Sequence, residues 1–302
     1  MEPSRDPSAR PGRGFLLPRD ADPGIAGWTG PHYHCAPRVD LRQGRLVLIL
    51  PGTGAMPRDY RLLADQAADL GSHCLVLRYP NDRSVNELSG QDPSLHFALR
   101  MDFWDGGSRT GVVEVGASDA LLGRLVAALR KLAAVSPEED WGRFLSEGEP
   151  SWERIAVFGH SLGGGYAALA ARLHPVERAV AMGWADWCRP DGRLSTWVLE
   201  ADWHPRSRRM AFLHERDEMV PFPVGEAVAR AFCDSEGAVR VESGDPPWGR
   251  SRILSTDLDP AEEREVPVAR HSCLALDANT PRWADGQPVF ADVWTWLLVG
   301  SP

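Results

Sequence analysis

The chain has 302 residues, enough for one large α/β domain or two small ones, and its 43% apolar content is ample for a packed core. Its net charge of −9 argues against nucleic-acid binding, because phosphate contacts need clustered cations. The five cysteines lack metal-ligand spacing, so free thiols and no metal site are expected. No apolar run approaches the roughly 18 residues that span a bilayer, and residues 1–14 lack the apolar core of a secretory signal, so we expect a cytoplasmic protein without a membrane span.

The chain begins with a region rich in proline and glycine. Residues 1–40 are interpreted as a flexible or loosely packed lead-in, although 32–35 favour a short strand. Internal repeats and Gly/Ser linkers are missing from the sequence, so residues 41–302 are expected to form one domain.

An alternation of strands and helices follows. The apolar run 45–50, the helical pattern 57–70 and the apolar run 73–79 predict a strand, a helix and a second strand, all joined as one unit. Two strands joined through a helix are expected to be parallel, because the helix returns the chain to the end of the sheet at which the first strand began. Later runs extend the pattern: strands are expected at 154–158, 178–183, 209–214 and 238–241, and helices at 118–134, 224–233 and 289–299. The predicted fold class is therefore α/β, with a doubly wound, mostly parallel sheet.

Two segments interrupt this alternation. Residues 80–110 are polar and are expected to be an irregular excursion over the carboxyl edge of the sheet. Residues 184–207 carry four tryptophans and are interpreted as a lid or pocket wall, with Trp184 and Trp187 expected to contact substrate. The alternative is that the tryptophans only pack this insertion onto the core. Residues 243–268 are expected to be a long polar loop.

The heptapeptide 159–165, Gly-His-Ser-Leu-Gly-Gly-Gly, lies between a predicted buried strand and a predicted helix. A G-x-S-x-G turn in this context is typical of a nucleophile elbow, which exposes a serine hydroxyl at the carboxyl edge of the sheet. Ser161 is therefore the candidate nucleophile. The amide of Leu162 begins the helix, where developing negative charge is stabilised.

A serine nucleophile needs a base and a group that orients the base. Asp217 follows a predicted strand, and His271 precedes the final helix, so both are expected on loops at the same sheet edge. Asp186, after the preceding strand, is an alternative acid. His160 is expected to be structural.

The motifs at 50–54 (Leu-Pro-Gly-Thr-Gly), 159–164 and 216–221 (Arg-Asp-Glu-Met-Val-Pro), together with His271, resemble those of the α/β-hydrolase superfamily over residues 40–300. The chain is also similar to a little-characterised group of bacterial hydrolases with a PGTG loop and a triple-glycine elbow. The resemblance implies serine-dependent acyl transfer without metal or cofactor. The hypothesis for the oxyanion hole is the amide of Leu162 together with that of Thr53 or, as an alternative, Gly54, and Gly54 is also expected beside the substrate.

The function expected from these residues is hydrolysis of a carboxylic ester or thioester through an acyl-enzyme, on a small to medium, partly apolar or aromatic molecule. Alternatives are an acyltransferase, a non-hydrolytic lyase or cyclase that uses His271 and Asp217, and a catalytically silent binding module. The three candidate residues Ser161, Asp217 and His271 count against a silent module, because binding alone does not require all three.

Overall fold

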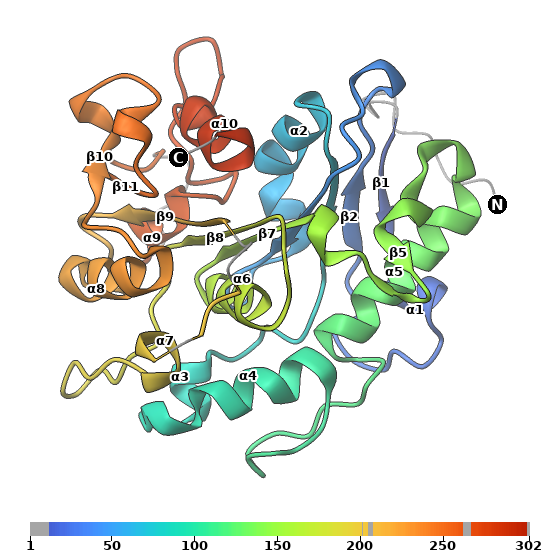
Figure 1. The fold of residues 1–302 in the computed structure, drawn as a ribbon, viewed down its shortest axis with the longest axis horizontal. Coiled ribbons are helices and arrows are strands. Elements are labelled where there is room, and N and C mark those ends of the chain that lie inside the picture. Colours follow the sequence, from blue (N-terminus) through green and yellow to red (C-terminus); the bar gives the residue numbers. More distant parts are fainter. Residues whose placement is uncertain (1–11, 201, 205–207, 262–266, 301–302) are drawn as a thin grey trace.

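The computed structural model describes residues 12–200, 202–204, 208–261 and 267–300. Its centre is a nine-stranded sheet in the order β1-β2-β4-β3-β7-β8-β9-β11-β10 (Figure 1). The strands are β1 (Arg13–Leu16), β2 (His32–Cys35), β3 (Leu46–Leu50), β4 (His73–Val76), β7 (Ile155–His160), β8 (Arg178–Met182), β9 (Arg208–His214), β10 (Val239–Arg240) and β11 (Ile253–Thr256). A separate ribbon pairs β5 (Leu145–Ser146) with β6 (Glu149–Pro150).

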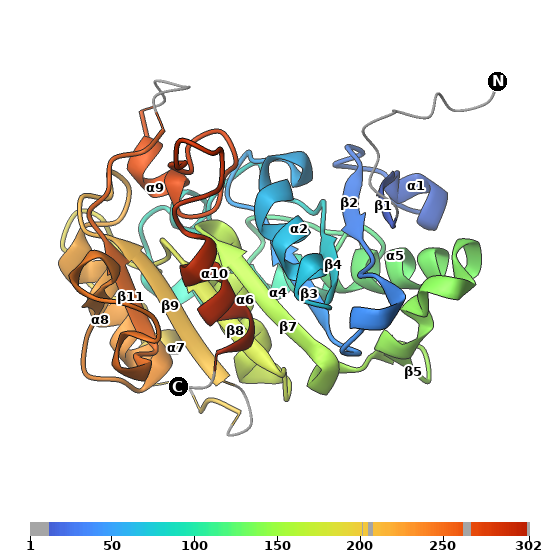
Figure 2. The same ribbon diagram turned by 90° about the horizontal axis from the view of Figure 1, so that it is seen from above.

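In the order of the sheet, every pair of neighbours from β4 through β3, β7, β8, β9 and β11 to β10 is parallel. At the other edge, β2 is antiparallel to both β1 and β4 (Figure 2). This confirms the predicted mostly parallel, doubly wound sheet. The continuous apolar sequence of β3 has a simple cause, because its alternate residues enter the two cores on opposite faces of the sheet: Leu46, Leu48 and Leu50 enter one, and Val47 and Ile49 enter the other.

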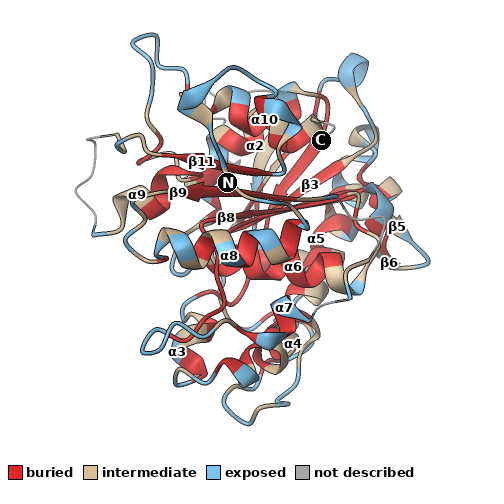
Figure 3. Ribbon diagram, turned by 60° about the vertical axis from the view of Figure 1, so that its left-hand side comes forward, coloured by how far each residue is buried: buried red, intermediate tan, exposed pale blue. Residues whose placement is uncertain are grey.

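Helices cover both faces of the sheet (Figure 3). One face packs against α2 (Arg61–Asp69) and α10 (Ala291–Val299), and the other packs against α5 (Leu121–Val135), α6 (Leu162–Leu173) and α8 (Phe222–Cys233). Outside the second face lies a further layer formed by α3 (Val85–Leu88), α4 (His96–Asp105) and α7 (Thr196–Leu199). The remaining short helices are α1 (Pro18–Ala21) and α9 (Ala269–Cys273). None of the helices within the described residues is both long and apolar enough to cross a bilayer.

The N-terminal region differs from the interpretation of residues 1–40 as a loosely packed lead-in. The part that the structure describes, from residue 12 onward, supplies β1 and β2 to the main sheet, and the strand expected at 32–35 is confirmed. Tyr33 and Cys35 are buried against α2, and the Arg13 guanidinium pairs with Asp65 of that helix at 2.7 Å. Residues 1–11 lie outside the described residues.

Other segments also differ from the expectations. The predicted polar loop 243–268 contains β11, a fully buried four-residue strand that separates β9 from β10. The excursion 80–110, expected to be irregular, contains α3 and the ten-residue helix α4. The helix predicted over 118–134 begins at Leu121 and ends at Val135.

Candidate active site

Ser161 occupies a strained position between β7 and α6. Its backbone angles are φ 54° and ψ −119°, in a region that side-chain-bearing residues rarely adopt. The helix starts so close to β3 that a Cβ on Gly163 would lie 1.9 Å from the carbonyl oxygen of Leu50. Only glycine fits at position 163, which explains the second glycine of the G-x-S-x-G motif. The segment forms the strand, turn and helix that this motif predicts.

His271 and Asp217 come together from distant parts of the chain. His271 lies in α9, Asp217 lies in the loop after β9, and His271 Nδ1 is 2.8 Å from Asp217 Oδ2. The other carboxylate oxygen of Asp217 accepts the amides of Met219 at 2.7 Å and Val220 at 2.9 Å. Burial would raise the pKa of Asp217, but its hydrogen bonds with His271 and the two amides outweigh burial and lower the pKa.

The second ring nitrogen of His271, Nε2, is buried and has no hydrogen-bond partner among the described residues. His271 lines the same pocket as Ser161. The ring is therefore oriented on one side by a carboxylate and offers its other nitrogen to the pocket. Glu218, for which the sequence predicted no role, accepts the amides of Arg270 and His271 at 3.1 and 2.9 Å and fixes the first turn of α9.

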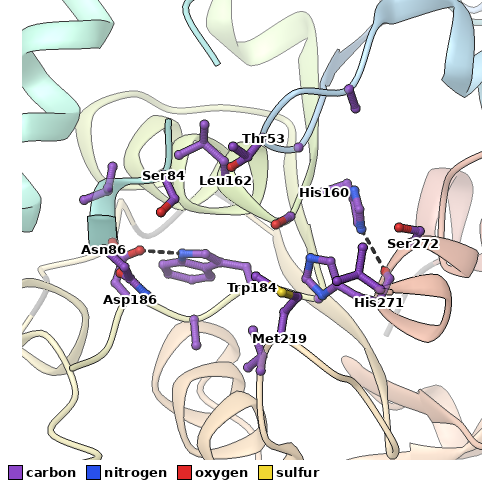
Figure 4. Close-up of a pocket in the computed structure, with 18 of the residues that line it drawn as sticks. Thr53, Ser84, Asn86, His160, Leu162, Trp184, Asp186, Met219, His271 and Ser272 are labelled. Carbon is purple, nitrogen blue, oxygen red and sulfur yellow. Dashed lines mark hydrogen bonds between the residues drawn. The ribbon is translucent and has the colours of Figure 1, made fainter. Parts of the chain in front are cut away.

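The loop after β3 presents one unused amide toward this site. The Gly52 amide donates to Tyr60 Oη at 2.8 Å, the Gly54 amide donates to the Asn81 carbonyl at 2.7 Å, and the Ala55 amide donates to the Gly52 carbonyl at 3.2 Å. In the described part of the chain, no acceptor faces the Thr53 amide. Thr53 lines the pocket (Figure 4).

The amide of Leu162, the first residue of α6, has no acceptor within its helix and none elsewhere in the described ranges. Leu162 also lines the pocket, so the two amides expected to form the oxyanion hole both border it. Gly54 does not: it is absent from the pocket wall, and its amide is bonded to Asn81. The substrate contact expected at Gly54 stays a prediction.

The pocket has a volume of 330 Å³ and largely apolar walls. Trp184 and Trp187 are buried and both line it, as expected from the sequence. The Trp184 ring lies between Asp186 and His271 in the view of Figure 4. Further apolar side chains of the wall come from α3, from the loop after β9 and from the segments that flank α9: Val85, Met219, Val220, Val268 and Leu276.

Asp186, the alternative acid, is bound to a different group. Its two oxygens accept Nε and Nη2 of the buried Arg100 at 2.7 and 2.5 Å, and they also accept the indole N–H groups of Trp184 at 3.0 Å and Trp197 at 2.9 Å. Burial would raise the pKa of Asp186, but Arg100 reverses the effect and holds the pKa at about 2. Arg100 was not identified from the sequence, because α4 falls in a segment expected to be irregular.

The third glycine of the elbow motif leaves space for Arg100. A Cβ on Gly165 would lie 2.0 Å from Cζ of Arg100, so the guanidinium occupies the space that a side chain on α6 would need. Arg100 Nη1 also donates to the Leu162 carbonyl at 3.2 Å. The buried pair of Arg100 and Asp186 thus lies directly against the helix that starts at Ser161.

His160 is buried and structural, as expected. Its ring bonds to Tyr60 Oη at 3.0 Å. The other ring nitrogen, Nε2, bonds to the His271 carbonyl at 2.9 Å (Figure 4). Burial, with the nearby His271 ring as a second cause, lowers the pKa of His160 to about 3. Within the described residues, no group of three or more His, Cys, Asp or Glu side chains is arranged to hold a metal ion.

The described residues have the architecture of the α/β-hydrolase fold: Ser161 lies in the turn after the central parallel strand β7, Asp217 in the loop after β9, and His271 in the short helix α9. No family model matches the sequence, and no curated protein matches it. One similar solved structure is a protein of Klebsiella pneumoniae subsp. pneumoniae MGH 78578 that is provisionally described as a dienelactone hydrolase. It is 14% identical, with a TM-score of 0.40, over 82% of this chain and 85% of that chain.

Proposed function

We propose that this protein is a serine hydrolase that cleaves a carboxylic ester or thioester of a small to medium, partly apolar or aromatic molecule through an acyl-enzyme. One observation carries the proposal. His271 is bonded to Asp217 through Nδ1, while its buried and unpartnered Nε2 belongs to a ring that lines the pocket of the strained Ser161. A serine hydroxyl becomes a useful nucleophile when a base of this kind can take its proton.

In the first half of the reaction, Ser161 Oγ bonds to the acyl carbon and its proton passes to His271 Nε2. The carbonyl electron pair moves onto oxygen, and the amides of Leu162 and Thr53 stabilise the resulting oxyanion. Asp217 stabilises the imidazolium and holds its tautomer. The carbon–oxygen or carbon–sulfur bond then breaks, and His271 returns the proton to the departing alcohol or thiol.

In the second half, water replaces the leaving group. His271 Nε2 takes one proton of the water, and the water oxygen bonds to the acyl carbon of the acyl-enzyme. The bond to Ser161 Oγ breaks, the serine regains a proton from His271, and a carboxylic acid is released. Each residue ends in its starting state, so the cycle needs no redox partner.

The pocket supports the substrate class. Trp184 and Trp187 offer large, rigid apolar surfaces next to the candidate nucleophile, which suits an aromatic or short aliphatic group. The volume of 330 Å³ lies at the lower end of the range for small-molecule sites and favours a small or medium molecule.

The test combines active-site labelling with turnover. The wild-type protein, Ser161→Ala and Ser151→Ala, a control at a buried serine outside the pocket, are treated with a fluorophosphonate probe and weighed as intact proteins. The same three are assayed on p-nitrophenyl esters of increasing acyl length. We expect one adduct and ester turnover in the wild type and in the control, and neither in Ser161→Ala. Turnover retained by Ser161→Ala would reject the acyl-enzyme.

A further inference from the structure

Buried side chains hold four backbone groups of the loop 51–55, which are the carbonyls of Pro51, Gly52 and Ala55 and the amide of Gly52. The Tyr79 hydroxyl donates to the Pro51 carbonyl at 2.5 Å, and the side-chain amide of Asn81 donates to the carbonyls of Gly52 at 2.7 Å and Ala55 at 2.9 Å. Asn81 is 1% exposed and Tyr60 is fully buried. Thr53 and Gly54, at the tip of this loop, are exposed. An exposed turn can bond its backbone groups to water, so this number of buried contacts is more than the turn needs for its own stability.

The contact of Asn81 with Gly52 fixes a direction. In a trans peptide the C=O of one residue and the N–H of the next lie in one plane and point in opposite directions. Holding the Gly52 carbonyl therefore aims the Thr53 N–H. The orientation of the Asn81 amide is itself set, because its Oδ1 accepts Arg78 Nη1, which leaves Nδ2 to donate to the loop.

A second set of contacts joins this loop to the helix of the candidate base. The Gly52 amide donates to Tyr60 Oη, Tyr60 Oη bonds to His160 Nδ1, and His160 Nε2 bonds to the His271 carbonyl. The direction of each bond follows from the chemistry. A carbonyl only accepts, so Nε2 carries the proton, and the low pKa of His160 leaves Nδ1 bare to accept the phenol proton.

We propose that Asn81, Tyr60 and His160 are positioning residues that aim the Thr53 amide at the oxyanion and fix its separation from His271. The inference rests on the proposed serine hydrolase function and goes beyond it, because none of the three residues is assigned a chemical step. Preorganised donors help only if they are already aimed at the place where charge develops. Losing one contact should therefore lower kcat more than it raises KM.

The chain offers matched controls for two substitutions. Tyr60→Phe removes a hydroxyl with two partners, whereas Tyr166→Phe removes a buried hydroxyl that has none among the described residues. Asn81→Asp keeps the shape of the side chain but removes the NH₂ group that donates to two carbonyls. Its control is Asn279→Asp, because the buried Nδ2 of Asn279 has no partner in the described ranges.

The experiment measures kcat and KM on a p-nitrophenyl ester, together with inhibition by a trifluoromethyl ketone, whose serine adduct carries an oxyanion. All assays are run well below each variant's unfolding temperature. We expect Tyr60→Phe and Asn81→Asp to lower kcat about 10- to 100-fold with KM changed less than about threefold, and to weaken the inhibitor by a similar factor. Both controls should stay within about twofold of wild type.

Three outcomes would overturn the inference. If wild type is active and the two variants match their controls, positioning by these residues is wrong while the hydrolase proposal stands. If kcat falls but inhibitor affinity does not, the effect is not on the oxyanion. If wild type neither turns over esters nor reacts with a fluorophosphonate, the proposed function fails and the inference fails with it.

A variant that does not fold is replaced by a pair at His160. Gln at this position can donate to the His271 carbonyl but loses the bond to Tyr60, whereas Asn can accept the Tyr60 hydroxyl but loses the bond to His271. Each variant keeps only one of the two contacts, so both should lower kcat well below that of the controls, and a wild-type kcat in either would also reject the inference. Nitrogen-15 spectra of the histidines add a direct check, because His160 should be the Nε2–H tautomer at pH 7.

Discussion

Two carboxylates at the same edge of the sheet illustrate how partners decide a residue's use. Asp186 follows β8 and Asp217 follows β9, and their side chains are 2% and 3% exposed. Asp217 faces an imidazole that can take and release a proton. Asp186 faces a permanently charged guanidinium and two indole donors, so its oxygens are fully occupied.

The two acids differ in whether their partner has a free hydrogen-bonding group left. Beside Asp217, the Nε2 atom of His271 has no hydrogen-bond partner among the described residues. Each oxygen of Asp186, in contrast, already accepts two hydrogen bonds. Burial and position alone would not distinguish the two acids. Substitutions at one should mainly change turnover, and substitutions at the other should mainly change stability.

The largest effect is expected from Asp217→Asn. Asn can still accept the amides of Met219 and Val220, so the loop should persist, but its NH₂ group would force the wrong His271 tautomer. We expect kcat on p-nitrophenyl esters to fall about 10³- to 10⁴-fold with little change in unfolding temperature. Asp186→Asn, assayed while folded, is the control and should fall less than about tenfold; similar losses in both would remove the distinction.

Next in size is the effect of Asp186→Asn on stability. It leaves the Arg100 guanidinium, which is 1% exposed, without its counter-charge, so we expect the free energy of unfolding in urea to fall by about 3 kcal/mol or more. The double variant Arg100→Met with Asp186→Leu should recover much of this loss, because an apolar pair leaves no charge buried. A single variant as stable as wild type would show that the counter-charge of Asp186 is not needed for stability.

As the pH falls, the buried histidines should destabilise the folded protein before Asp186 or Asp217 becomes protonated. Burial lowers the pKa values of His32 and His160 to about 3, whereas the unfolded chain takes up these protons near pH 6.5. The unfolded state therefore binds more protons between about pH 6.5 and 3, and stability falls as pH drops through this window. Each residue should contribute about 1.4 kcal/mol per pH unit.

Urea unfolding between pH 7 and 5 measures this dependence. Asp277 acts in the opposite direction, because burial raises its pKa to about 7. It is one group against six histidines whose pKa burial lowers, namely His32, His34, His73, His96, His160 and His174. Stability that stays constant or rises toward pH 5 would contradict the burial of these histidines as neutral rings. The Asp186 pair should persist throughout, since the pKa of its carboxyl is about 2.

The smallest effect is expected from Trp184→Phe, which links the two regions. The variant removes one of the donors to Asp186 and part of the pocket wall. We expect a loss of about 1 kcal/mol in stability, a KM raised a few-fold for aromatic esters, and an unchanged kcat. Measured on acetate and benzoate esters, an equal change for both would show that Trp184 does not contact the acyl group.

The parts of the site that follow strands were accessible from the sequence. The apolar run before Ser161 and the Asp-Glu-Met-Val-Pro segment at Asp217 are linear patterns, so their place at the sheet edge could be predicted. The strand β11 could not, because four buried residues within a polar stretch carry no clear periodicity. Arg100, Tyr60 and Asn81 act through contacts far apart in the chain, which no local pattern reveals.

The close approach of Arg100 to Gly165 has a consequence for related sequences. Because the guanidinium fills the space of the missing side chain, a larger residue at 165 requires a smaller one at 100. Losing the arginine would then leave Asp186 without its counter-charge. Positions 100, 165 and 186 should therefore covary as a set, and a homologue with alanine or serine at 165 should have replaced both members of the ion pair.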